Sequence, residues 1–326
     1  MSATATTASN VPVGALAERR GGRYGEGYWA GAFRRLLKNK VATASALFII
    51  LITLTAIILP EVYPRTYADQ SYVAVTQGPS RHYPMGTDQL GRDMFIRLVF
   101  GARISLTVGF VVQAVLLLIG VPAGLIAGFF GGKVDTIIMR TVDVLYAMPS
   151  LLFVIIIMTF LRGTLDNNPS GWWGQVSRLD AKTGGLVGVY MGLGLIGWLT
   201  VSRIVRANTM SLKEREFCEA VRAIGASRSR IMFRHLLPNT IAPIVVATTL
   251  GIPSAILSEA GISFLGIGVI PPMPSWGLMI SDAIPQMRVH SYMLIFPALA
   301  LSLTVLAFNF LGDGLRDALD PWMKRS

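Results

Sequence analysis

The feature that most constrains this 326-residue sequence is the placement of its charged residues, because seven stretches of 18 residues or more contain no Asp, Glu, Lys or Arg. A bilayer core requires about 20 helical residues, and apolar runs that do not alternate with polar residues favour helices over barrel strands. Gly and Pro recur inside the runs, which membrane helices tolerate. We therefore predict an all-α, polytopic membrane protein with six transmembrane helices, at Val41–Leu59, Ile104–Phe130, Val144–Leu161, Thr183–Ser202, Leu236–Ser258 and Val289–Gly312.

A seventh uncharged stretch, Ala260–Ser281, contains Pro271, Pro272 and Pro274 followed by Trp276. Clustered prolines remove backbone donors and break a helix. We interpret this stretch as the end of the fifth span leading into an interfacial or re-entrant loop, with Trp276 near the lipid headgroups.

The basic residues set the expected orientation. If both termini are cytoplasmic, 20 of the 29 Lys and Arg residues fall on the cytoplasmic side, as the positive-inside rule requires. The same asymmetry accounts for the net charge of +11 without nucleic acid as a partner.

The longest cytoplasmic loop, residues 203–238, has the pattern of two short helices joined at a glycine. Ser211 and Glu214 have the spacing of a capping box, an apolar stripe of Leu212, Phe217, Ala220, Val221 and Ile224 follows, and Gly225 is placed to end the first helix. Ser227 is placed to begin the second. The pattern fits either a docking surface for a partner or an interfacial helix that only holds the loop against lipid.

The run 219–225 (EAVRAIG) with Leu237-Pro238 resembles the EAA loop of permease subunits in bacterial ABC importers. It departs from that family's pattern at Val221, where a second Ala is usual, and at His235, where an apolar residue is usual. The resemblance implies a coupling helix seated in a cleft of a cytoplasmic ATPase, with coupling residues Glu219, Ala220, Val221, Arg222, Gly225, Ala226, Leu237 and Pro238.

Three further segments resemble the C-type permease subunit of dipeptide, oligopeptide and nickel importers: 82–93 with 101–105, 258–268 with 274–277, and 311–321. The resemblance implies a type I ABC importer permease fold that carries no cofactor, with ATP and Mg²⁺ on partner subunits. It implies as partners a second homologous permease, two ATP-binding subunits, an extracytoplasmic solute-binding protein and a peptide substrate. It also implies that the chain lies in the bacterial inner membrane. A nickel permease of the same family would share nearly all of these motifs.

An ion-coupled secondary carrier is the alternative from another class, and it would require ionisable residues near the bilayer midplane or an inverted repeat. The six runs contain no such residue, and no repeat is evident. The single Cys218 and three scattered histidines supply no metal cluster or nucleophilic site, so we expect no catalytic residue.

The expected domain order is a disordered tail (1–30), a basic segment with the first span (31–60), and an external loop (61–103) in which Thr87 caps an interfacial helix. A five-helix core (104–312) that includes the EAA loop at 203–238 and a cytoplasmic tail (313–326) complete it. Glu259, at the outer edge of span five, has either a functional role or an interfacial position in contact with water.

Overall fold

The computed structural model describes residues 28–167 and 170–319, and within these it is mostly helical and contains no strand. Five helices there are long and apolar enough to cross a membrane, or six if a bent pair counts as one span. The elements are α2 (Tyr28–Lys38), α3 (Lys40–Val62), the 3₁₀ turn η1 (Tyr72–Ala74), α4 (Met94–Phe130), α5 (Gly132–Tyr146), α6 (Ser150–Asn167), α7 (Gly171–Lys182), α8 (Leu186–Lys213), α9 (Glu216–Ala223), α10 (Arg228–Arg230), the π-helical turn η2 (Ile231–Leu236), α11 (Leu237–Phe264), α12 (Trp276–Ala283), the 3₁₀ turn η3 (Ile284–Gln286) and α13 (Tyr292–Leu319).

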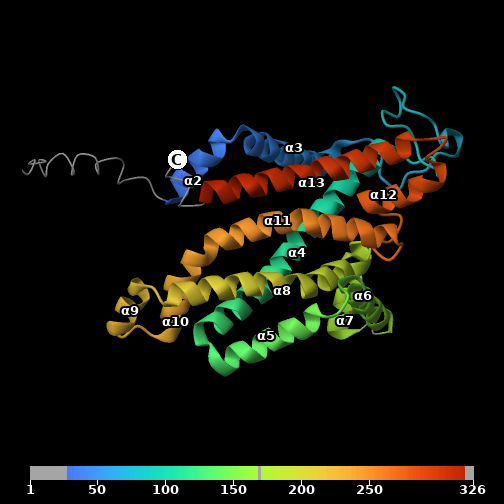
Figure 1. Cartoon of the computed structure of the whole chain (residues 1–326). Helices are drawn as coiled ribbons and strands as arrows, with labels where there is room; N and C mark the ends of the chain where they lie inside the picture. Colours follow the sequence, from blue (N-terminus) through green and yellow to red (C-terminus); the bar gives the residue numbers. More distant parts are fainter. Residues whose placement is uncertain (1–27, 168–169, 320–326) are drawn as a thin grey trace, which may run out of the picture.

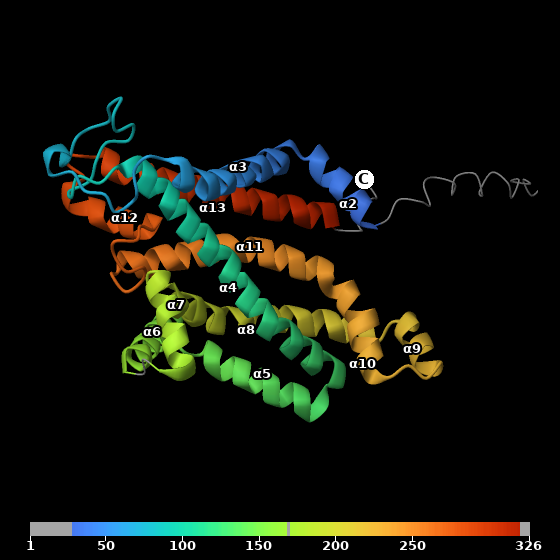
Figure 2. The same ribbon diagram turned by 180° about the vertical axis from the view of Figure 1, so that it is seen from behind.

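The long helices lie side by side, and α4 crosses them obliquely (Figures 1 and 2). Helix α9 lies at one end of the bundle, together with α2 and the end of α13, and α12 lies at the other end with the loops around residues 63–93. We refer to these as the α9 end and the α12 end.

The tightest crossing in the core joins α4 to α8. Gly120, Gly124 and Gly128 recur every four residues on α4, and a Cβ atom on any of them would collide with the backbone or side chains of α8. At Gly124 it would meet the carbonyl oxygen of Ser202 and lie 2.8 Å from Cβ of Val205. A stripe of small residues lets two membrane helices approach closely, so these glycines place α8 against α4.

Helices α3, α8, α11 and α13 confirm predicted spans, whereas the second span differs at its start. Helix α4 begins at Met94, ten residues before the predicted Ile104, and the Asp93 carboxylate caps it by accepting a hydrogen bond from the Phe95 backbone N–H at 2.9 Å. The interfacial helix expected from Thr87 is wrong. Thr87 instead forms a bridge with Asp93 that closes a turn, so Arg97 belongs to α4 itself.

The third predicted span, Val144–Leu161, is wrong as a continuous helix. The chain breaks between α5 and α6, whose axes are bent by 92°. The break contains Pro149, which provides no N–H for a helix that arrives from α5 and disfavours helical backbone at Met148.

The seventh uncharged stretch begins inside α11, which ends at Phe264, and continues through a loop into α12, as the prolines indicated. The prediction for Trp276 is wrong, because its side chain is fully buried and its Nε1–H donates to the Leu98 carbonyl at 3.1 Å. Trp276 therefore fixes α12 onto α4. Of the predicted tail, residues 1–27 lie outside the described part of the chain, and the last three residues begin α2.

Candidate functional site

The predicted coupling residues gather at the α9 end, but their helix begins later than the capping pattern indicated. Ser211 lies inside α8, which continues to Lys213, and α9 begins at Glu216 with Arg215 as its N-cap residue. The Ser211–Glu214 capping box is therefore wrong. Glu219, Ala220 and Arg222 all project from α9 with exposed side chains.

Gly225 ends α9 as the sequence predicted. Its φ of +79° is left-handed, its N–H donates to the Arg222 carbonyl at 3.0 Å, and the Ala226 N–H donates to the Val221 carbonyl at 3.3 Å. This pair of bonds defines a Schellman motif, which satisfies carbonyls that a helix end would otherwise leave open. The glycine corner between the two helices is thus set by backbone geometry.

The apolar stripe on α9 divides into a buried part and an exposed part. Cys218 is fully buried and Val221 packs on the hydrophobic core of the α9 end, so these two residues attach α9 to the chain. Ile224 is 83% exposed and Phe217 is 36% exposed. The outward side of α9 and its C-cap therefore present the apolar side chain of Ile224, and part of Phe217, among exposed charged side chains.

The second helix of the loop is not separate. Ser227 caps it as predicted, with its hydroxyl accepting from the Arg230 N–H at 3.3 Å, but α10, η2 and α11 then form one continuous 37-residue helix. The π-helical turn precedes Pro238, and Leu237 donates to the Met232 carbonyl five residues back. A helix that passes Pro238 without interruption joins the loop directly to the fifth span.

Ion pairs fix the neighbouring end of α8. Arg206 makes a two-point contact with Asp135 of α5, in which the Nη2–Oδ2 distance is 2.6 Å. Arg203 pairs with Asp143 at 2.8 Å, and Lys213 donates to the Gly128 carbonyl at 2.9 Å. Arg206 and Asp135 are partly buried, and two-point arginine pairs fix orientation as well as distance. The support beneath α9 is therefore stiff.

A cavity of about 590 Å³ opens in the middle of the bundle between α4, α6, α8 and α11. Its walls are apolar, and its polar lining consists of uncharged side chains: Gln113, Ser150, Thr200, Ser254 and Ser258. None of these residues was predicted to line a cavity. For Ser254 and Ser258 the available signal was their spacing with Gly251, which places small residues on one face of α11.

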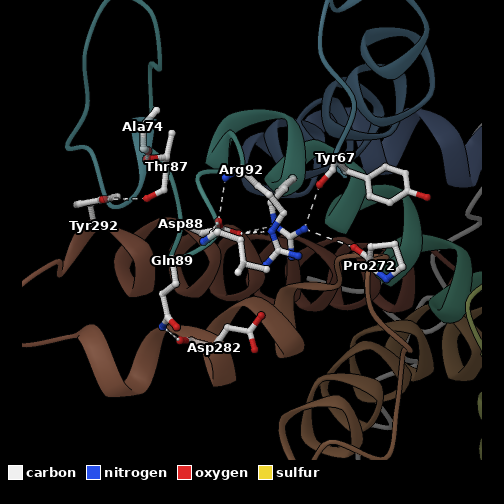
Figure 3. Close-up of polar contacts among 11 residues, drawn as sticks. Tyr67, Ala74, Thr87, Asp88, Gln89, Arg92, Pro272, Asp282 and Tyr292 are labelled. Atoms are coloured by element: carbon white, nitrogen blue, oxygen red, sulfur yellow. Dashed lines mark hydrogen bonds and ion pairs between the residues drawn. The ribbon is translucent and has the colours of Figure 1, made fainter. Parts of the chain in front are cut away.

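At the α12 end, the residues of the predicted external loop form a buried ion cluster (Figure 3). Asp88 accepts from Arg92 Nε at 2.6 Å and lies 3.4 Å from Arg97 Nε. Arg97 is 2% exposed and also donates to the carbonyls of Tyr67 and Pro272. One arginine thus ties the loop before α4 to the loop before α12.

A second buried polar group at this end is Glu259 of α11, which is fully buried. Its carboxylate accepts from the hydroxyls of Ser105 on α4, at 3.1 Å, and Ser263, at 2.6 Å. The interfacial, water-exposed position considered for Glu259 is therefore wrong. It lies inside the helix bundle and is not part of the cavity lining.

Among the described residues, no group of three or more His, Cys, Asp or Glu side chains is placed to hold a metal ion. Cys218 faces the interior of the loop, and burial raises the pKa of its thiol. The described residues thus form an exposed loop held by ion pairs at the α9 end, an uncharged cavity, and a cross-linked α12 end.

Comparison with known proteins agrees with this arrangement. Residues 120–325 match the family described as binding-protein-dependent transport system inner membrane component, and residues 27–79 match the N-terminal transmembrane domain of oligopeptide transport permease C.

Named relatives match almost the whole chain. The oligopeptide transport system permease protein OppC of Bacillus subtilis is 39% identical, with 91% of this chain and 90% of that protein covered. The dipeptide transport system permease protein DppC of Alkalihalophilus pseudofirmus is 40% identical, with the same coverage. The glutathione transport system permease protein GsiD of Pectobacterium atrosepticum is 39% identical, with 91% and 92% covered.

The fold also matches a solved structure, a chain of the MetNI methionine ABC transporter in an inward-facing conformation. The TM-score is 0.53 at 20% identity, with 70% of this chain and 98% of that chain covered. The chain is therefore a multi-pass membrane protein that belongs to the family of inner membrane permease components of binding-protein-dependent transport systems.

Proposed function

We propose that this chain is the permease subunit of an ATP-driven importer for dipeptides or oligopeptides, and that α9 couples it to a cytoplasmic ATPase. The peptide substrate is supported by the names of relatives that match over 91% of the chain. The coupling role is supported above all by one observation, the exposed apolar side chains of Ile224 and Phe217 on a loop that ion pairs hold in place.

The chemistry of that face suits a protein partner. Ile224 and Phe217 are exposed beside the charged side chains of Glu219 and Arg222, and apolar anchors within a polar rim are typical of protein interfaces. Because α9 is fixed to α8 by buried contacts and α10 continues into α11, a push on α9 would move both spans together.

The remaining partners follow from this assignment. The α9 end is cytoplasmic, in agreement with the positive-inside rule, and ATP and Mg²⁺ bind to two partner ATPases. A second, homologous permease encloses the pathway with this chain, and an extracytoplasmic binding protein delivers peptide at the α12 end. The central cavity is this chain's part of the pathway.

The coupling role is tested by Ile224→Asp. Ile224 is 83% exposed, so the substitution leaves the fold intact while it places a charge in the proposed interface. We expect ATPase subunits to co-purify poorly with the variant and peptide uptake to fall in parallel. The control for ATPase recovery is Val73→Asp, which adds the same charge at an apolar residue that is 92% exposed in the turn η1 between α3 and α4.

Normal ATPase recovery and normal uptake with Ile224→Asp would refute the coupling role. The substrate is tested separately, by uptake of a labelled dipeptide and of Ni²⁺ into proteoliposomes that contain the purified importer and its binding protein. Uptake of the peptide supports the proposal, whereas uptake of Ni²⁺ alone assigns the chain to nickel import.

A further inference from the structure

The central cavity contains one polar side chain whose hydrogen-bonding groups are not used by the rest of the protein. Gln113 lies on α4, is 5% exposed and lines the cavity. Its amide makes no hydrogen bond to any residue that the structure describes. Most buried polar groups are bonded, whereas neither atom of this amide is among the fully enclosed side-chain atoms that lack a partner. The amide therefore keeps access to the cavity and is free to bond to a ligand there.

The opposite wall is shaped to admit this amide. Gly251 of α11 faces Gln113, and a Cβ atom at position 251 would lie 2.7 Å from both Nε2 and Oε1 of the glutamine. Only glycine leaves that space. Because Gly251 has no side chain, the Gln113 amide lies against the backbone of α11 and borders the cavity.

The rest of the lining restricts what the ligand can be. The cavity is lined by hydroxyls and aliphatic side chains and includes no Asp, Glu, Lys, Arg, His, Cys or Met. A metal ion would find neither charged nor soft ligands there. The volume of about 590 Å³ lies within the range of about 300–1,000 Å³ typical of small-molecule sites.

A glutamine amide has one carbonyl acceptor and an NH₂ donor, and a peptide bond presents a complementary N–H and C=O whatever its side chains are. The hydroxyls of Thr200 on α8 and Ser254 on α11 add uncharged polar groups to the other walls of the cavity. Such a wall binds the part that all peptides share, and its lack of charge avoids trapping peptides that carry charged side chains.

We propose that the Gln113 amide is a substrate-contacting group that hydrogen bonds to the backbone amide of a peptide in the central cavity. This inference rests on the proposed function and adds to it a specific residue and a specific part of the substrate.

The test uses the complete importer in proteoliposomes with its binding protein. Gln113→Met removes the amide at nearly constant volume, and Gln286→Met, outside the cavity, is the matched control. Loss of one neutral hydrogen bond predicts that Gln113→Met lowers the maximal rate of dipeptide uptake about three- to tenfold. The control keeps the wild-type rate.

A backbone-modified substrate makes the test specific. A depsipeptide, in which an ester replaces the amide, lacks the N–H, and we compare its uptake rate with that of the parent peptide. Discrimination by the binding protein is the same for every permease variant and cancels in the comparison. We expect the peptide-to-depsipeptide rate ratio to fall toward one in Gln113→Met, as in a double-mutant cycle.

Gly251→Ala provides a second route if Gln113→Met assembles poorly, because its methyl group displaces the amide without removing it. The rate ratio should fall in this variant too. An unchanged ratio in an assembled, ATP-hydrolysing complex would overturn the role of Gln113 and leave the proposed function standing. A wild-type complex that imports no peptide would instead overturn the proposed function.

Discussion

The Glu259 site gives a prediction whose size follows from the structure. Glu259 is 0% exposed and accepts hydrogen bonds from Ser105 and Ser263. The Ser263 hydroxyl in turn accepts from the Val269 N–H at 3.1 Å. One carboxylate therefore joins α4, α11 and the loop that leads to α12.

Substitution of Glu259 by Leu keeps the side-chain bulk and removes both acceptors. Each buried hydroxyl that loses its partner costs about 1–3 kcal/mol, and a helical serine recovers part of this by donating to the carbonyl four residues back. We expect a net loss of about 2–4 kcal/mol in the free energy of unfolding for the two hydroxyls together. Glu259→Gln retains an acceptor for one serine and donates to the other, so its stability should stay within about 1 kcal/mol of wild type.

The measurement is unfolding of the purified chain in mild detergent, titrated with a denaturing detergent and followed by the fluorescence of its tryptophans. The buried Trp276 lies at the α12 end, beside the elements that Glu259 joins, and reports on their separation. If Glu259→Leu is as stable as wild type, or if Glu259→Gln loses as much as Glu259→Leu, the carboxylate is not the acceptor that holds these three elements.

Two further predictions concern packing and pH. Gly124→Leu should separate α4 from α8 and lower the unfolding midpoint, because overpacking costs about 1–3 kcal/mol or more. The control Gly261→Ala, where a Cβ meets no atom within 4 Å, should leave the unfolding midpoint unchanged or raise it. Equal midpoints for the two variants would contradict the close packing of α4 on α8. Burial raises the pKa of Asp282, against the opposing attraction of Arg97. The folded state therefore gains stability below the unfolded pKa of about 4 and loses it as pH rises through the higher folded pKa. Asp282→Asn should raise the melting temperature at pH 7 and leave it unchanged near pH 3, and the opposite trend would refute the role of burial.

The charge-free runs located the membrane helices well because the cost of an unpaired charge in lipid dominates all other preferences. The same rule placed the start of the second span too late. Arg97 is buried within α4, but Asp88 and two backbone carbonyls neutralise or bond to it. Counting charges along the sequence does not reveal that a partner such as Asp88, in the loop before α4, folds back onto the helix.

Local signals succeeded where the backbone alone decides and failed where tertiary contacts decide. Gly225 was predicted correctly because its positive φ is a backbone requirement that glycine meets best. Ser211 was assigned to a helix start because its spacing to Glu214 fits a cap, but α8 continues past it under the contacts that Arg206 and Lys213 make with α5 and α4. Gln113 gave no signal at all, since one uncharged polar residue in an apolar run does not indicate which way it faces.

Helix α11 connects the three parts of the protein that carry the proposed function. Its continuous extension begins at Arg228 in the loop beside α9, its middle contributes Gly251 and Ser254 to the cavity, and its far end is held by Glu259. If α11 is fixed near Glu259 and moved near Arg228, its position changes most beside α9 and least beside Glu259. On the proposed function, movement of α9 would therefore widen or narrow the inner part of the cavity while the α12 end stays closed around Glu259. Weakening that fixation, as in Glu259→Leu, should then uncouple ATP hydrolysis from uptake more than it slows hydrolysis, which distinguishes a mechanical role of the carboxylate from a purely structural one.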